Sequence, residues 1–191
     1  AYPDTVTAVI VGNEVLLRGE QPVDALAAYI RRVRAAVPQP VTYADVWEFW
    51  LRNARLAEAT SFVTVHILPF WEDEPVPVEH AVEHVLAIHD RVQARFAGHR
   101  VLIGETGWPT VGRNREGALP SRVNAARFVR GVVSAAEARG IGYNVVEAFD
   151  QPWKRLLEGA VGGYWGIFAS DGSAKFPLHG PVVEEPRWRI G

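Results

Sequence analysis

The sequence contains no cysteine and no methionine. Without cysteine the chain has no disulfide framework, no thiolate metal site and no cysteine nucleophile. Because it contains no methionine, the sequence has no initiator methionine, and no signal-peptide pattern is present at its start. We expect the sequence to be a processed form or a piece excised from a longer protein.

Long apolar runs and one-sided charge are also missing. No stretch of 18 apolar residues is present, so no segment is expected to contact or span a membrane. Twenty basic and 22 acidic residues are scattered along the chain with a net charge of −2, which disfavours nucleic acid as a partner. His80 and His84 stand one helical turn apart, but no third ligand or HExxH pattern accompanies them. We therefore predict no metal and no cofactor.

The chain has an excess of tryptophan and an alternating pattern of predicted strands and helices. Seven tryptophans, several of them near the ends of predicted strands, suit a ligand that stacks on aromatic rings, such as a carbohydrate. At 191 residues the chain fits a single domain with a sizeable core, and we assign residues 1–191 to one domain of catalytic type. Apolar runs predict strands over 7–12, 41–45, 61–66, 101–103 and 143–149, and helical periodicity predicts helices over 22–37, 46–57, 79–96 and 121–139.

Two of the predicted strands end in the same way. Val101–Ile103 is followed by Gly104 and Glu105, and the run Thr7–Val11 is followed by Gly12, Asn13 and Glu14. A single acid at the end of a strand is most simply a solvated loop residue, but a second segment with the same plan favours a chemical role. Glycoside hydrolysis requires two carboxyl groups, one to protonate the leaving oxygen and one to face the anomeric carbon. Asn13 is placed to hold a sugar 2-hydroxyl.

Polar side chains stand at or near the carboxyl ends of all five predicted strands. They are Asn13 and Glu14, Asp45, His66, Glu105 and Glu147. Strands that alternate with helices form parallel βαβ units, which keep their ligands at the carboxyl ends of the strands. The pattern predicts an α/β fold of the (β/α)₈ TIM-barrel type, with these residues on its active-site face. A doubly wound sheet is the alternative, although the Gly-rich phosphate loop typical of that fold is not present.

The two glutamate segments carry a family resemblance. Val11–Leu16 (VGNEVL) and Ile103–Thr110 (IGETGWPT) resemble the two signatures of glycoside hydrolase family 17, the β-1,3-glucanases and their bacterial transglycosylase relatives. The resemblance implies that Glu14 ends the fourth barrel strand as the acid/base and Glu105 ends the seventh as the nucleophile. Segments 42–47, 65–71 and 148–154 are similar to the other strand ends, and 164–168 (YWGIF) is similar to the family's closing segment.

A match to strands four to eight implies that the first three βα units of the barrel are absent. Five units leave two open sheet edges, which invite pairing with another chain. We expect one of three explanations for the missing βα units: they lie on another polypeptide, they have been removed, or pairing with a second copy replaces them. His66, where plant members tend to carry Asn or Tyr, indicates the bacterial branch, which implies a periplasmic or extracellular location.

The resemblance implies a retaining β-1,3-glucan glucanosyltransferase or endo-β-1,3-glucanase that works by double displacement on β-glucan oligosaccharides. The alternative is a non-catalytic glucan-binding fragment, or an incomplete barrel that needs its N-terminal part. Predicted substrate-binding residues are Asn13, Asp45, His66, Trp71, Trp108, Glu147 and Trp153. Structural roles compete with these: ion pairs for the two acids, a satisfied strand-end residue for His66, and lids over the core for the tryptophans.

Overall fold

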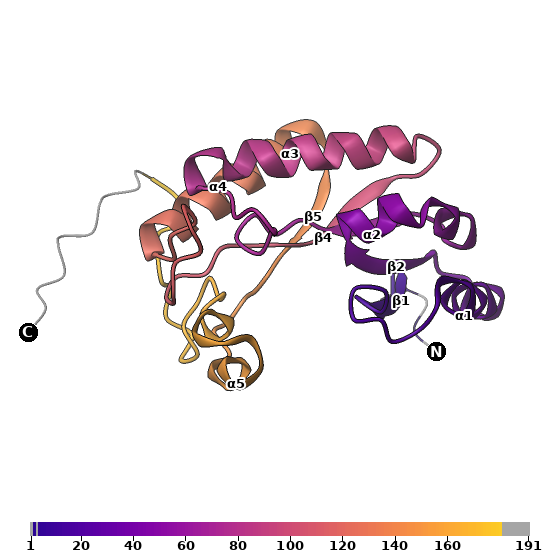
Figure 1. The fold of residues 1–191 in the computed structure, drawn as a ribbon, viewed down its shortest axis with the longest axis horizontal. Helices are drawn as coiled ribbons and strands as arrows, with labels where there is room; N and C mark the ends of the chain where they lie inside the picture. Colours follow the sequence, from indigo (N-terminus) through magenta and orange to yellow (C-terminus); the bar gives the residue numbers. More distant parts are fainter. Residues whose placement is uncertain (1, 3, 181–191) are drawn as a thin grey trace, which may run out of the picture. The chain divides into compact units, whose positions relative to one another are not determined.

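The computed structural model describes residue 2 and residues 4–180 of the chain. Strands and helices alternate along most of it, as the periodicity predicts (Figure 1). In chain order the elements are β1 (Val9–Asn13), α1 (Val23–Ala36), β2 (Val41–Val46), α2 (Trp47–Arg52), η1 (Ala54–Ala59), β3 (Val63–His66), α3 (Val78–Arg95), β4 (Val101–Thr106), α4 (Arg122–Arg139), β5 (Gly142–Val145), η2 (Pro152–Lys154), α5 (Arg155–Glu158) and η3 (Ala160–Gly163). No helix among these residues has the length and hydropathy needed to cross a membrane.

The strands form one sheet in the order β1-β2-β3-β4-β5, so each strand lies beside its neighbour in the sequence. The pairs β1–β2, β2–β3 and β3–β4 are parallel, with Val9 opposite Val41, Ala44 opposite Thr64 and Val63 opposite Val101. Parallel strands need a crossover between them, and the intervening helices supply it. The α/β fold with a parallel sheet is thus confirmed.

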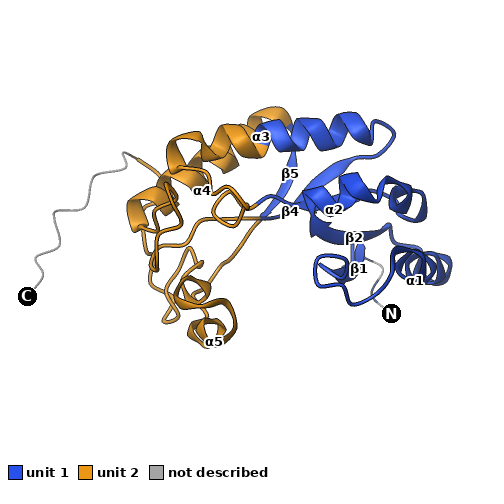
Figure 2. Ribbon diagram, in the orientation of Figure 1, with its two compact units in different colours: residues 1–67, 86–105, 140–144 blue, residues 68–85, 106–139, 145–191 orange. Residues whose placement is uncertain are grey.

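The described chain divides into two compact units, shown in blue and orange in Figure 2. Unit 1 comprises residues 1–67, 86–105 and 140–144, and unit 2 comprises residues 68–85, 106–139 and 145–191. The carboxyl ends of β1, β2 and β3, and of β4 up to Glu105, therefore belong to unit 1. The assignment of residues 1–191 to one domain of catalytic type stays a prediction.

The core of unit 1 is built on β2 and β3, whose residues are buried almost throughout. Helix α1 packs on β1 and β2, and α2 packs on β2 and β3. Trp50 of α2 is fully buried, lies near Tyr43 and Phe96 with ring centroids 5.8 Å apart, and donates its indole N–H to the Thr64 carbonyl at 2.8 Å. Continuous burial on both faces explains why these strands have apolar runs rather than an alternating pattern.

Unit 2 has an aromatic core and few regular elements beyond α4. Phe70 lies 5.9 Å from both Trp108 and Trp165, and Trp108 lies 5.5 Å from Phe128, measured between ring centroids. The predicted strand 143–149 is shorter in the structure, where β5 ends at Val145. The reason is a change of partner, because the backbone groups of residues 147 and 148 are bonded to the segment 165–168.

Candidate active site

The glutamate at the end of β1 is presented by an irregular strand end. The pairing of β1 with β2 shifts register between Ile10 and Asn13, and Gly12 has a φ of 86°. A Cβ at Gly12 would lie 3.0 Å from the Val15 side chain, in a backbone conformation that other residues rarely adopt. Glu14 itself has a φ of 54°, and its N–H donates to the Ala44 carbonyl at 2.8 Å. The glycine of the VGNE segment thus permits the bend that delivers Glu14.

A second glycine makes room for a histidine between the two acids. The β3–β4 pairing shifts register after Val65, which sets His66 opposite Glu105. A Cβ at Gly104 would lie 2.5 Å from the Thr64 methyl group and 3.1 Å from Cδ2 of His66. Only a residue without a side chain lets the buried His66 ring occupy this position.

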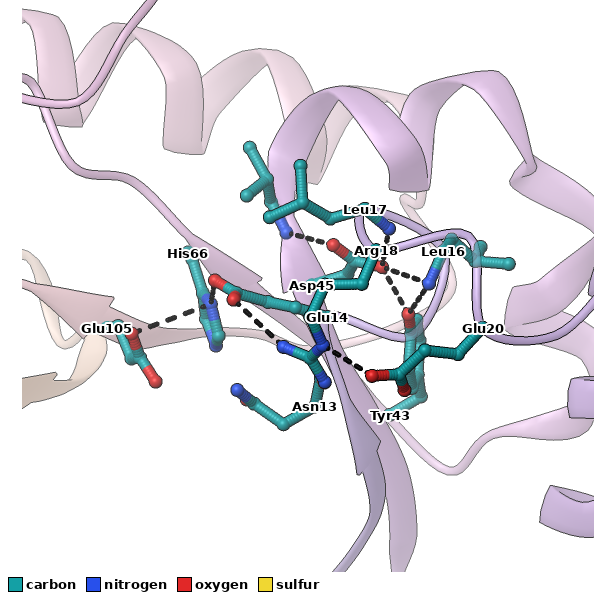
Figure 3. Close-up of polar contacts among 11 residues, drawn as sticks. Asn13, Glu14, Leu16, Leu17, Arg18, Glu20, Tyr43, Asp45, His66 and Glu105 are labelled. Carbon is teal, nitrogen blue, oxygen red and sulfur yellow. Dashed lines mark hydrogen bonds and ion pairs between the residues drawn. The ribbon is translucent and has the colours of Figure 1, made fainter. Parts of the chain in front are cut away.

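Glu14, His66 and Glu105 form a cluster in unit 1 (Figure 3). His66 Nδ1 lies 2.9 Å from Oε1 of Glu14 and 3.7 Å from Oε2 of Glu105. One ligand atom from each of the three residues lies within 4.8 Å of the other two. The His66 side chain is 1% exposed, whereas those of Glu14 and Glu105 are 21% and 31% exposed. A buried imidazole therefore lies between two carboxylates that solvent or a ligand can reach.

The electrostatics of Glu14 favour its ionised form. The hydrogen bond with His66 is the largest cause that lowers the pKa of Glu14, partial burial opposes it, and the charges of His66 and Arg18 lower the pKa further. Arg18 lies 3.3 Å from Oε2 of Glu14 and 2.7 Å from the Glu20 carboxylate. Glu14 is thus held by an imidazole on one side and a guanidinium on the other.

The cluster has two possible chemical uses. Carboxyl groups roughly 5–5.5 Å apart are typical of retaining glycosidases, and one carboxylate oxygen of Glu14 lies within 4.8 Å of one of Glu105. Two carboxylate oxygens and an imidazole nitrogen could also hold a divalent cation. His66 Nδ1 already has a hydrogen-bond partner in Glu14 without one.

Asp45, predicted to bind substrate, is buried and bonded to the protein itself. Its Oδ2 accepts hydrogen bonds from the N–H groups of Leu16 and Leu17 at 3.2 and 3.4 Å and from the Tyr43 hydroxyl, and its Oδ1 accepts one from the Val46 N–H at 2.8 Å. The side chain has no exposed surface with which to meet a sugar. This corrects the expectation. Tyr43 was not expected in the site, although its place two residues before Asp45 puts both on one face of β2.

The remaining prediction in unit 1 concerns Asn13. Asn13 precedes Glu14 and is exposed at the end of β1. Its backbone carbonyl accepts a hydrogen bond from Arg18. The structure therefore places Asn13, Glu14, His66 and Glu105 at the carboxyl ends of β1, β3 and β4, and their roles stay predictions.

Four predicted site residues belong to unit 2: Trp71, Trp108, Glu147 and Trp153. Glu147 Oε2 accepts hydrogen bonds from Lys154 Nζ at 2.8 Å and from Gln151, which is the ion-pair role that competed with sugar binding. Glu147 Oε1 is buried and has no hydrogen-bond partner among the described residues. The side chain is thus held within the protein by Lys154 and Gln151, and its other oxygen presents no surface to a sugar.

The three tryptophans differ in exposure. Trp108 is 1% exposed, packs among aromatic rings and donates its N–H to the Leu119 carbonyl at 3.1 Å, so it belongs to the core and offers no face to a sugar. Trp71 and Trp153 are 39% and 59% exposed. Trp71 stacks on Trp165 at 6.0 Å, and Trp153 bonds to Gln151 at 3.1 Å. Of the predicted stacking platforms, two have exposed surface.

Known proteins are similar to this chain in sequence and in fold. Residues 1–166 match the family described as the BtgE/BtgC glycoside hydrolase domain. A glucan 1,3-beta-glucosidase from Schizosaccharomyces pombe is 31% identical over 92% of this chain and 58% of its own length. A glucan 1,3-beta-glucosidase from Saccharomyces cerevisiae is 28% identical over 91% and 62%.

A solved structure from the same family has a similar fold. The glycoside hydrolase family 17 beta-1,3-glucanosyltransferase from Rhizomucor miehei has a TM-score of 0.83 and 29% identity, over 91% of this chain and 64% of its own. The chain thus spans about three fifths of the length of these relatives. Its parallel sheet with flanking helices resembles part of their TIM-barrel fold. On the match over residues 1–166 and these likenesses, the chain belongs to the BtgE/BtgC glycoside hydrolase domain family, within glycoside hydrolase family 17.

Proposed function

We propose that this chain carries the catalytic pair of a retaining enzyme that acts on β-1,3-glucan, as a glucanosyltransferase or an endo-β-1,3-glucanase. The observation that carries the proposal is the cluster of Glu14, His66 and Glu105, with one oxygen of each glutamate within 4.8 Å of the other. That separation is nearer to the roughly 5–5.5 Å between the carboxyl groups of retaining enzymes than to the roughly 6.5–9.5 Å of inverting enzymes. It suits direct attack on the anomeric carbon by one carboxylate while the other transfers a proton to the leaving oxygen.

In the first half-reaction Glu105 attacks the anomeric carbon and forms a glycosyl ester, while the bond to the leaving oxygen breaks. Glu14 gives its proton to that oxygen, so the first product leaves as an alcohol. In the second half-reaction the ionised Glu14 takes a proton from the acceptor, whose oxygen displaces Glu105. Water as acceptor gives hydrolysis, and a sugar hydroxyl gives transfer.

His66 is proposed to favour the ionised form of Glu14. It hydrogen-bonds Glu14 at 2.9 Å and lies 3.7 Å from Glu105, so one imidazole faces both carboxylates. Its bond to Glu14 lowers the pKa of that carboxyl group and supports the base role in the second half-reaction. We assign His66 a positioning role rather than direct contact with the sugar.

The substrate class rests on the relatives. Two are named glucan 1,3-beta-glucosidases, and an active-site mutant of the R. miehei enzyme is described in complex with laminaritriose. That structure has a TM-score of 0.80 and 29% identity to this chain. We therefore propose β-1,3-linked oligosaccharides as ligands. Asn13 is proposed to hold a sugar hydroxyl beside Glu14, and the exposed Trp71 and Trp153 are proposed sugar contacts of unit 2.

We propose that the protein works outside the cytoplasm. A relative from Candida albicans, 28% identical over 87% of this chain, is named a cell surface mannoprotein. The curated relatives named above are fungal, so they give no support to the bacterial, periplasmic branch that His66 suggested. That narrower placement stays a prediction from the sequence.

A second function is favoured by one observation. β1 ends the sheet of the described residues, and Ile10 on this strand is half-exposed. A strand edge of this kind accepts a further strand. In this alternative the chain binds glucan but turns it over only when further strands, from the same protein or a second copy, complete the barrel.

The test is a product analysis with laminarihexaose labelled at its reducing end. Products both shorter and longer than the hexaose indicate a transferase, and shorter products alone indicate a hydrolase. Glu105→Gln and Glu14→Gln should abolish either pattern. Glu20→Gln is the matched control, because this acid lies in the same turn, pairs with Arg18 and has no place in the cluster. Unchanged hexaose with retained laminarin binding would favour the alternative, and turnover by Glu105→Gln would refute the proposal.

A further inference from the structure

The turn that follows β1 is fastened to β2 by two buried side chains. In this turn, residues 14–20, the Arg18 N–H bonds to the Glu14 carbonyl at 3.0 Å and the Glu20 N–H bonds to the Val15 carbonyl at 2.9 Å. The N–H groups of Leu16 and Leu17 stand at the start of this turn, where no preceding carbonyl is available to them. Both point at the carboxylate of Asp45 (Figure 3).

Tyr43 completes this arrangement. Its hydroxyl donates to Oδ2 of Asp45 and accepts the Leu16 N–H at 2.9 Å. Tyr43 and Asp45 have no exposed surface, so water cannot replace either bond without opening the sheet. Burial is the largest cause that raises the pKa of the Tyr43 phenol, which keeps its hydroxyl a donor. We name Tyr43 and Asp45 the β2 clamp.

Glu14 needs such a clamp because of its backbone. A φ of 54° lies in the left-handed region, which a glutamate adopts rarely and holds only when its surroundings impose it. On one side, the N–H of Glu14 itself is bonded to Ala44 of β2. On the other side, the β2 clamp holds the amides of Leu16 and Leu17. The residue is thus fixed to β2 from both ends, and its carboxyl group is directed to His66 at 2.9 Å.

We propose that Tyr43 and Asp45 are positioning residues for the acid/base Glu14, acting through the amides of Leu16 and Leu17 without contacting substrate. The inference rests on the proposed function, because Glu14 needs positioning as an acid only if the chain belongs to a glucan-active enzyme. It replaces the substrate-binding role expected for Asp45.

The first test probes the clamp without any activity. Amide hydrogen exchange followed by NMR should show the Leu16 and Leu17 amides exchanging at least tenfold faster in Asp45→Asn and in Tyr43→Phe, relative to the Val65 amide of β3. Thr42→Val is the matched control: Thr42 lies on β2 as well and bonds to the Phe62 carbonyl at 2.7 Å, away from the turn. If Asp45→Asn does not fold, Tyr43→Phe decides alone. Unchanged exchange at Leu16 and Leu17 in the folded variants overturns the inference.

The second test separates positioning from a general loss of structure. On laminarihexaose, both variants should lose at least tenfold in kcat with KM within twofold of wild type, whereas Thr42→Val should keep both. On a 2,4-dinitrophenyl β-laminarioside, whose leaving group departs without a proton, sodium azide should accelerate both variants and give a β-glycosyl azide, because azide attacks the glycosyl–Glu105 ester without needing a base and releases the Glu105 carboxylate. A rise in KM alone on laminarihexaose, or no acceleration by azide with the activated substrate, overturns the inference.

The two hypotheses fail in different ways. If wild type converts no β-1,3-glucan, the proposed function fails, and the positioning role fails with it. If wild type is active and the clamp variants match it in kcat and in amide exchange, only the inference fails.

Discussion

Units 1 and 2 both contain partly or fully buried acidic residues, but the side chains that pair with these carboxylates differ. In unit 1, Glu14 and Glu105 face a buried histidine and remain partly exposed. In unit 2, Glu147 is paired with Lys154 at 2.8 Å, and Asp150 is paired with the buried Lys175 at 2.5 Å. A lysine fixes a carboxylate as an anion, whereas an imidazole can exchange a proton with it. The comparison therefore marks unit 1 as the place for proton chemistry and unit 2 as a structural network of charges.

The largest difference is expected between two single variants, one that replaces an acid of unit 1 and one that replaces an acid of unit 2. Glu105→Gln removes the nucleophile, and turnover of laminarihexaose should fall by roughly 10⁴-fold or more. Glu147→Gln keeps the shape of the side chain and leaves the nucleophile in place, so turnover should fall by about tenfold at most. Initial rates of both purified variants measure the difference. Equal losses would erase the distinction between the two units.

Breaking the buried ion pair of unit 2 should cost stability rather than chemistry. Lys175→Met leaves the Asp150 carboxylate buried without its cation, and unfolding by urea should show a loss of about 3–5 kcal/mol. The double variant Lys175→Met with Asp150→Leu removes both charges and should regain much of that loss. A Lys175→Met chain as stable as wild type would contradict the structural role given to this pair.

A smaller effect is expected when His66 is replaced in unit 1. His66→Asn removes the hydrogen bond that is the largest cause lowering the pKa of Glu14, so that pKa should rise. The protonated acid then persists to higher pH, and the basic limb of the profile of kcat/KM against pH should move upward. We expect turnover at the optimum to fall by roughly 10–100-fold, because the Glu14 carboxyl group loses its orientation. A basic limb that stays in place, or moves downward, would show that His66 does not set this pKa.

The smallest effect is expected from metal removal. The cluster of Glu14, His66 and Glu105 could hold a cation, but His66 Nδ1 already has a hydrogen-bond partner in Glu14. Dialysis against EDTA should therefore leave turnover of laminarihexaose unchanged. Loss of activity on dialysis, restored by one added divalent metal, would instead make the cluster a metal centre.

Much of the fold and the central part of the site could be predicted from sequence. The alternation of apolar runs with helical stripes predicts the parallel sheet, and the two Gly-containing segments place Glu14 and Glu105 at the ends of β1 and β4. His66 follows from its position at the end of β3. The positions of these residues agree with the structure because the carboxyl ends of parallel strands meet at one edge of the sheet, whereas their roles stay predictions.

The roles of buried residues could not be predicted in the same way. A strand-end aspartate has the same local pattern whether its partner is a sugar or a pair of amides, and the amides that bind Asp45 lie 28 and 29 positions away. Trp108 lies three residues after Glu105 and directly before a proline, a sequence pattern that also suits a tryptophan exposed at a strand end to stack on a sugar. In the structure Trp108 is buried in the aromatic core of unit 2. Such outcomes depend on contacts that are distant in the sequence, which local periodicity does not record.

Gly104 has a consequence for how this site tolerates change. The methyl group of an alanine there would lie 2.5 Å from the Thr64 side chain and 3.1 Å from the His66 ring. In a saturation library, tolerance at position 104 should therefore follow side-chain volume and not polarity, with glycine alone retained among active clones. A Thr64→Ser background removes the methyl group that the side chain of Gly104→Ala would meet first. Recovery of Gly104→Ala among active clones in that background would show that the constraint on this acid motif is space for its neighbour, not the chemistry of glycine.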